Sequence, residues 1–184
     1  RFFKDDNLRS LVNKDALVAA LDGWTFLDDN RTYVLSGWGA LSRVSGATER
    51  MIALQRNSGH YFQRPDDNYV SVDSSLTSMT GYAGRIQLNK NRGAILLNSA
   101  IGFISPKFEN NDLGFNSYSD IINMHVYTGY MWNDPTQYYQ NASLTFSYFS
   151  NYNFDGINTA AGIGTSANIT FPDLYGANAN FTYY

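Results

Sequence analysis

The sequence predicts an all-β fold: an antiparallel, up-and-down transmembrane β-barrel, of which these residues form a complete or incomplete segment of about eight strands. Three observations predict this class. Apolar and polar residues alternate along most of the chain, which is typical of strands whose two faces have different surroundings. The alternating runs extend for about 10–14 residues, whereas globular strands usually have about 5–6 and a tilted bilayer-spanning strand about 9–11. The connections between the runs alternate between short and long.

Four alternating runs occupy the first part of the chain. In the first run, leucine, alanine and threonine at odd positions oppose valine, alanine and Trp24 at even positions. The second run is long enough for a strand, but its two faces are ambiguous. The third run opposes Tyr82 and Ile86 to Arg85, and the fourth opposes isoleucine and leucine to alanine and glycine. We expect these strands at about 16–27, 32–45, 78–89 and 93–104.

Four further runs follow. The fifth opposes Met124 and Val126 to His125, and the sixth opposes Phe146 and Tyr148 to serine and threonine. In the seventh and eighth, alanine, isoleucine and aromatic residues oppose glycine, asparagine, serine and threonine. We expect these strands at about 118–132, 137–150, 158–171 and 175–184.

The connections predict one domain, or a fragment of one, over residues 1–184. In outer-membrane barrels, short turns are periplasmic and long loops are extracellular. The long connections are therefore expected at the outer end of the barrel. Within the longest, Ala47 to Arg56 has the spacing of a short helix. The outer-end loops are expected near 1–15, 46–77, 105–117 and 151–157.

The composition excludes several classes of protein. Charged residues are 16% of the chain, against about 25% in soluble domains. A net charge of -3 argues against a nucleic-acid partner, and the absence of cysteine excludes disulfides and cysteine-ligated zinc. The polar faces of the strands contain small uncharged residues rather than Lys and Glu. A soluble sandwich would place charges there, so a crowded, wet barrel interior fits better.

Polar side chains on the strands are expected to face this interior. A charged side chain on the lipid-facing side would cost about 2–4 kcal/mol at the middle of the bilayer. Such residues could fill the interior as a structural network, or they could line a pore. The residues predicted to face the interior are Arg85, Asn98, Asn123, His125, Asn141 and Asn168.

The loop after the predicted helix carries a dense group of aromatic and planar polar side chains. One interpretation is a loop that folds over or into the barrel mouth. The other is a ligand-contacting loop, whose rings and amides stack on and hydrogen-bond a polar ligand such as a glycan. The residues concerned are His60, Tyr61, Phe62, Gln63, Arg64 and Asp66.

Sites for metal or catalysis have few candidates, and we expect no resident metal, no cofactor and no catalytic residue. Carboxylates around Asp66, Asp67 and Asp73 could bind calcium, but Asp and Asn are also common turn formers. Glu109 and Asp112 could act as paired carboxylates, although hydrogen bonds from loop backbone or pairing with Lys107 explain them better.

Two loop motifs and a strand motif resemble a known family. They are Ala53-Leu54-Gln55-Arg56-Asn57-Ser58-Gly59-His60-Tyr61-Phe62-Gln63-Arg64-Pro65-Asp66, Ser105-Pro106-Lys107-Phe108-Glu109-Asn110-Asn111-Asp112-Leu113-Gly114-Phe115 and Gly81-Tyr82-Ala83-Gly84. Over roughly residues 45–184, the chain resembles an uncharacterised Bacteroidetes-type outer-membrane family. The resemblance implies an N-terminal carbohydrate-binding-like domain outside these residues and a C-terminal β-barrel domain of unknown function. It implies a location in the outer membrane and does not assign an activity.

These observations favour a non-catalytic protein of the bacterial outer membrane, acting in transport or as a component of a cell-surface assembly. Its expected partners are the lipid bilayer, missing strands or other membrane proteins at the sheet edges, and a glycan as a candidate ligand. One alternative is a soluble β-sandwich or lectin-like carbohydrate-binding module. Another is a barrel hydrolase with His60, Glu109 and Asp112 in its loop active site.

Overall fold

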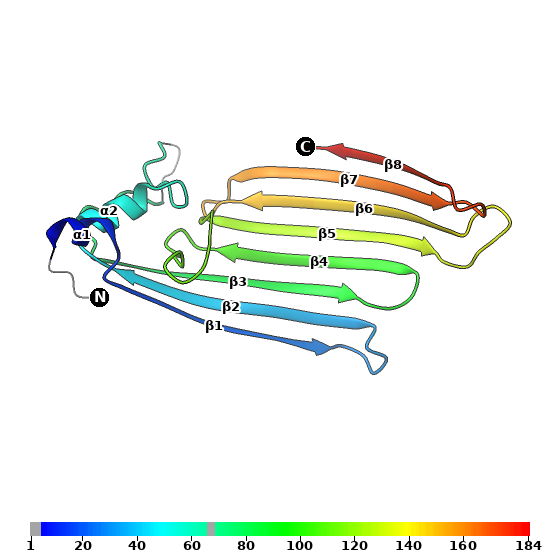
Figure 1. The fold of residues 1–184 in the computed structure, drawn as a ribbon, viewed down its shortest axis with the longest axis horizontal. Helices are drawn as coiled ribbons and strands as arrows, with labels where there is room; N and C mark the ends of the chain where they lie inside the picture. The colour runs from blue at the N-terminus through cyan, green and yellow to red at the C-terminus, as the bar shows by residue number, and fades with distance from the viewer. Residues whose placement is uncertain (1–4, 66–68) are drawn as a thin grey trace.

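Eight strands form one antiparallel sheet in chain order, from β1 at one edge to β8 at the other (Figure 1). The computed structural model describes residues 5–65 and 69–184. The predicted all-β, up-and-down arrangement of eight antiparallel strands is confirmed. The strands are β1 Asp15–Phe26, β2 Tyr33–Ser45, β3 Ser78–Lys90, β4 Ile95–Ile104, β5 Ile121–Trp132, β6 Asn141–Tyr152, β7 Asn158–Thr170 and β8 Gly176–Tyr183.

Two helices lie at the end of the sheet that carries the long connections, which we call the loop end (Figure 1). The predicted helix is α2, Thr48–Arg56. The sequence reading did not include α1, Asp6–Leu11, because six residues are too few to show a helical period. Asp5 caps α1 by accepting a hydrogen bond from the backbone N–H of Asn7 at 2.8 Å. The connections 27–32, 91–94, 133–140 and 171–175 lie at the opposite, turn end.

The register sorts the side chains into two faces. Residues directly opposite each other project to the same side of a sheet, so Leu41, Tyr82 and Ile86 share one face with Ile101 and Val126. We call this the apolar face. Its charged side chains in the eight strands stand next to strand ends: Asp15, Arg43 and Lys90.

The other face, which we call the polar face, carries the small polar residues. The register also resolves the ambiguous strand β2. Trp38 lies opposite both Asp22 and Arg85, so the even-numbered residues of β2 belong to the polar face. Its odd-numbered residues, including Leu35 and Leu41, belong to the apolar face.

The sheet does not close into a barrel within these residues, a point that the sequence left open. Among the described residues, β1 pairs with β2 alone and β8 pairs with β7 alone. Alternation reports which faces differ in their surroundings. It carries no information on how many strands complete the circumference, because closure depends on strand number, tilt and stagger.

No helix in the described part of the chain combines the length and the apolar character required to cross a membrane.

The long connections fold onto the polar face rather than away from it. Met51 and Leu54 of α2 pack with Val44 and Met79, which lie opposite each other on β2 and β3, in a small buried cluster. Further along the same strands, Ser42 Oγ accepts a hydrogen bond from the Glu109 N–H at 2.9 Å. Gly81 lies opposite Ser42. A Cβ atom there would come within 2.2 Å of Phe108 N.

Gly81→Ala is expected to displace residues 105–120 from the sheet. The added methyl group would overlap backbone atoms, which cannot move aside like a flexible side chain. Overpacking of this kind costs about 1–3 kcal/mol. Thermal unfolding and protease cleavage within residues 105–120 measure the effect. Gly39→Ala on neighbouring β2 is the control, because nothing lies within 4 Å of its Cβ position. Equal protease resistance in the two variants would contradict the close docking.

Candidate functional site

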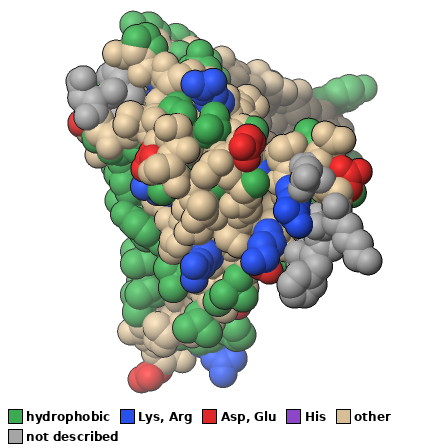
Figure 2. All heavy atoms as spheres, turned by 90° about the vertical axis from the view of Figure 1, so that its left-hand side faces the viewer, with side chains coloured by type: hydrophobic (Ala, Val, Ile, Leu, Met, Phe, Trp, Pro, Cys, Tyr) green, Lys and Arg blue, Asp and Glu red, His purple; other side chains and the backbone are tan. Residues whose placement is uncertain are grey.

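A loop lobe covers the loop end of the polar face. We define it as residues 46–65, 69–77, 105–120 and 153–157. Viewed toward the loop end, hydrophobic side chains run along one side of the molecule, and charged side chains are scattered over the other parts (Figure 2). The lobe brings together titratable residues distant in sequence.

His60 lies at the centre of this lobe. Its Nδ1 atom is 2.8 Å from the Pro106 carbonyl oxygen and 3.0 Å from Ser119 Oγ. Its Nε2 atom is 3.0 Å from Glu109 Oε2, and the two side chains are 2% and 3% exposed. A carbonyl oxygen accepts only, so Nδ1 carries a proton. The ring also packs edge-on against Phe62, with centroids 5.7 Å apart.

Glu109 is held as a carboxylate. Its burial raises its pKa, but hydrogen bonds from His60 and from the Asn111 N–H outweigh burial, so the pKa lies below the ordinary value. The Asn111 N–H donates to Glu109 Oε1 at 2.6 Å. The contact between His60 Nε2 and the Glu109 carboxylate joins residues 57–62 to residues 105–111.

Asp120 forms a second connection within the lobe. Its carboxylate accepts from the Arg64 guanidinium, from the Tyr69 hydroxyl and, at 3.0 Å, from the Phe154 N–H. The residue has a φ of 60°, an uncommon conformation for a residue other than glycine. These three partners hold it there. They also explain why β5 begins at Ile121, three residues later than predicted.

Two amide side chains complete the framework. Gln55 is fully buried; its Nε2 donates to the carbonyls of Met51 and Asp73, and its Oε1 accepts from the Asp73 N–H at 2.7 Å. Asn13, which directly precedes the sheet, donates to Asp112 and accepts from Arg50 Nε at 2.9 Å. Each amide ties α2 or its flank to another segment.

The predicted ligand-contacting loop divides into buried and accessible residues. His60 and Phe62 are buried, and Arg64 pairs with Asp120. Tyr61, at a φ of 54°, and Gln63 remain exposed, and Gln63 Nε2 donates to the Arg56 carbonyl. Asp66 lies outside the described residues. In this arrangement, a ligand at the lobe surface would meet Tyr61 and Gln63 rather than His60.

The six polar residues predicted to face the interior lie on one face of the sheet, the polar face. These are Arg85, Asn98, Asn123, His125, Asn141 and Asn168. Asn98 lies at the centre of a chain of amides, donating to Asn89 and contacting His125 Nε2. Farther along the face, Asn168 donates to Ser166 at 3.2 Å and Thr170 donates to Asn141 at 3.2 Å.

Of the residues considered for metal binding and acid–base chemistry, Asp73, Glu109 and Asp112 have other partners. Asp73 accepts from the Ser75 hydroxyl and N–H at 2.6 and 2.8 Å, and these bonds lower its pKa. Asp66 and Asp67 lie outside the described residues. Within the described ranges, no three His, Cys, Asp or Glu side chains are grouped for a metal ion. Glu109 and Asp112 point to different partners, His60 and Asn13, rather than to each other.

Sequence reasoning missed several residues that hold this site. In the sequence, Ser42, Ser119 and Asp120 have the pattern of ordinary strand or loop residues, and nothing around Asn13 indicates a role. Their contacts join positions that lie up to 99 residues apart, so no local spacing in the sequence predicts these contacts. The only sequence signal was the density of His, Asp and Asn in the two loop motifs.

The fold and the site define a class of protein: an open, eight-stranded antiparallel sheet with a lobe docked on one face. The chain belongs to the family described as domain of unknown function DUF5916, whose model matches residues 7–184. Membership of an uncharacterised family, expected from the loop motifs, is confirmed. No curated protein and no solved structure matches the chain.

The Glu109 carboxylate makes the stability of the lobe depend on pH. The pKa of Glu109 is lower in the folded protein than its ordinary 4.5. Its contribution is therefore complete above about pH 4.5 and is lost as the pH falls through the lower folded value. Glu109→Gln should remove this acid dependence and destabilise the lobe by about 1–3 kcal/mol at neutral pH.

Hydrogen exchange of residues 105–117 between pH 3 and pH 7, corrected for intrinsic rates, measures this dependence. Asp155→Asn, which removes an exposed carboxylate at the same end of the sheet, is the control and should retain the wild-type profile. Matching pH profiles for wild type and Glu109→Gln would contradict the role of the pair.

Proposed function

We propose that this chain is part of a β-barrel of the bacterial outer membrane, with its apolar face toward lipid and its polar face toward a wet interior. One observation carries the proposal: the apolar face is exposed across all eight strands and has charges only near strand ends. Leu21 is 84% exposed and Ile163 is 52% exposed. Soluble monomers rarely expose continuous apolar patches larger than a few hundred Å².

The ends of the strands support the same orientation. Lys90 lies on the apolar face, but its ammonium group donates to the carbonyls of Arg92 and Ile95 in the adjacent turn. Tyr130 and Trp132 lie on this face at the same end, with ring centroids 4.8 Å apart. Amphipathic aromatic rings and lysines that reach out of the apolar zone are typical of membrane interfaces. Phe146 and Tyr148, in contrast, lie near the middle of β6.

The role that we propose is transport or participation in a surface assembly, without catalysis. The lobe lies on the polar face at the loop end, where it would narrow the mouth of a barrel. The burial of the His60–Glu109 pair supports a structural role, because a substrate cannot reach either side chain. The family resemblance extends the proposal to a Bacteroidetes-type protein whose further domains include a carbohydrate-binding-like one, with a glycan as a candidate ligand.

The edges of the sheet require partners under this proposal. Unpaired backbone groups are very costly in hydrocarbon, so β1 and β8 would pair with further strands of the same protein or with another barrel protein. A soluble carbohydrate-binding sandwich is less well supported, because it would need a second sheet to cover the apolar face.

Membrane fractionation of the full-length protein tests the proposal. We expect it in the outer-membrane fraction, released by detergent and not by salt or alkali. Recovery of a soluble monomer without detergent would overturn the proposal.

A matched pair of substitutions tests the orientation. Val126 and Tyr127 are neighbours in the middle of β5, 42% and 38% exposed, and lie on opposite faces. Val126→Arg should lower the yield of folded, membrane-inserted protein, because arginine on a lipid-facing position costs about 2–4 kcal/mol. Tyr127→Arg should insert at close to the wild-type level. The reverse order of yields would contradict the assignment of the faces.

A further inference from the structure

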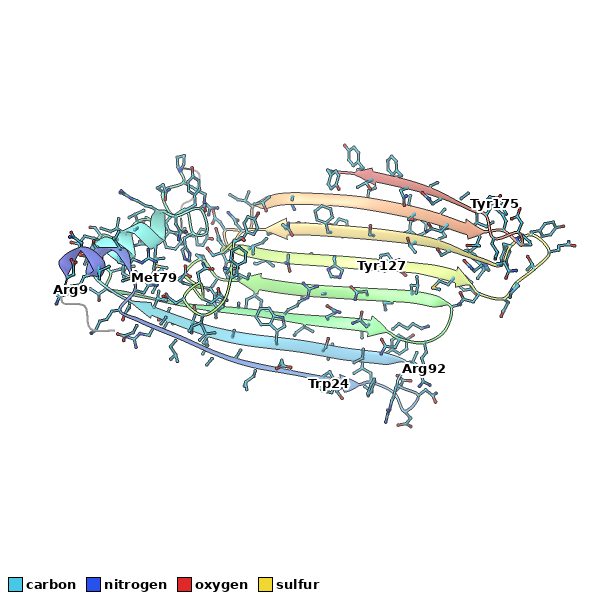
Figure 3. All side chains as sticks on the ribbon, in the orientation of Figure 1. Arg9, Trp24, Met79, Arg92, Tyr127 and Tyr175 are labelled. Carbon is cyan, nitrogen blue, oxygen red and sulfur yellow. The ribbon has the colours of Figure 1, made fainter. Side chains whose placement is uncertain are left out.

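Two tryptophans stand exposed on the polar face, away from the loop lobe. Trp24 is 71% exposed and Trp38 is 42% exposed. Figure 3 shows Trp24 on the turn-end half of β1. A groove passes over this part of the sheet, and its lining includes Asp22, Trp24, Ser36, Trp38, Arg85 and Gln87. Bulky aromatic rings facing a wet interior need an explanation other than lipid contact.

The register arranges these side chains in two adjacent rows. Asp22, Trp38 and Arg85 lie opposite one another on β1, β2 and β3. Neighbouring strands are about 4.8 Å apart, so an acid and a base flank the Trp38 indole at about 10 Å from each other. The next row toward the turn end is Trp24, Ser36 and Gln87. Each row therefore combines one indole with hydrogen-bonding groups beside it.

These groups fit the two kinds of surface that a sugar ring presents. The C–H face of a pyranose stacks on an indole, and its hydroxyls at the ring edge accept from guanidinium or amide donors and donate to a carboxylate. Arg85 Nε contacts Gln87 Oε1 at 3.4 Å, and a guanidinium has four further N–H donors for a bound molecule. Asp22 and Arg85 are the charged residues that the strands place on the polar face, and their charges cancel.

The rest of the polar face favours a neutral polar ligand over other classes. A second groove on this face, nearer β5–β7, is lined by amides and hydroxyls that include Gln140, Asn141, Ser143 and Asn168, together with Tyr127. A hydrocarbon ligand would leave these groups without partners. A polyanion would meet a single arginine and an aspartate.

We propose that the Trp24–Trp38 groove binds a neutral saccharide, with a sugar ring stacked on each indole. This proposal rests on the barrel function proposed above, because it names the ligand that the interior face would bind. It places the site on the sheet rather than on the loop containing His60.

Calorimetric titration of the detergent-solubilised full-length protein with maltohexaose, cellohexaose and chitohexaose tests it. We expect wild type to bind at least one of the three, and Trp24→Ala to weaken that binding about tenfold, as loss of one stacking contact predicts. The Trp24 side chain is 71% exposed, so this variant loses little packing and should remain folded. Trp38→Ala and Arg85→Gln should weaken the same binding.

Trp132→Phe, which alters an aromatic ring on the apolar face, is the control and should bind like wild type. Absence of binding to all three sugars, or equal binding by wild type and Trp24→Ala, overturns the saccharide site. If the protein is then still found in the outer membrane, the barrel proposal stands. A soluble protein that shows tryptophan-dependent binding would retain the saccharide site and overturn the barrel.

Discussion

The backbone register of the sheet is the constraint on which the rest of the structure depends. Because all seven strand pairs are antiparallel and nearly free of irregularity, each residue's face is fixed by its position alone. A slip of one residue would move a whole strand's side chains to the other face. The one register shift, at Asn151 and Tyr152, lies at the loop end of β6, where it affects few residues of either face.

The two faces then impose opposite requirements on the connections. The apolar face must remain largely uncovered if it is to meet lipid, so most of the long loops fold toward the polar face. Phe154, at the loop end, instead packs edge-on against Tyr82 of the apolar face, with ring centroids 6.2 Å apart. The other loops fold where the polar face offers room and partners. Gly81 leaves space for the backbone of Phe108, and Ser42 beside it accepts the Glu109 N–H. A small residue and a hydroxyl on adjacent strands thus position the segment that supplies the carboxylate to His60.

The sequence predicted the parts of this structure that depend on local pattern. Alternation in segments such as Ile122–Trp132 was enough to place strands and their faces, and helix α2 followed from its spacing. The alternation did not assign the two faces of β2, because Gly37, Gly39 and Trp38 reduce the contrast between an apolar and a polar face. The lobe contacts could not be predicted, because His60–Glu109 and Arg64–Asp120 join residues 49 and 56 positions apart. Whether the sheet closes into a barrel could not be predicted either, because the sequence of an edge strand does not specify which strand pairs with it.

We expect the lobe to open at a lower free energy than the sheet beneath it. Its buried apolar cluster consists of Val44, Met51, Leu54 and Met79, and most other attachments are hydrogen bonds and ion pairs. Segments with few buried apolar contacts open at lower free energy than the strands beneath them. Charged attachments respond to acid, whereas the ladder of backbone bonds does not. The sheet therefore provides the more stable support, the lobe covers its loop end, and Trp24 and Trp38 lie on the sheet outside the lobe.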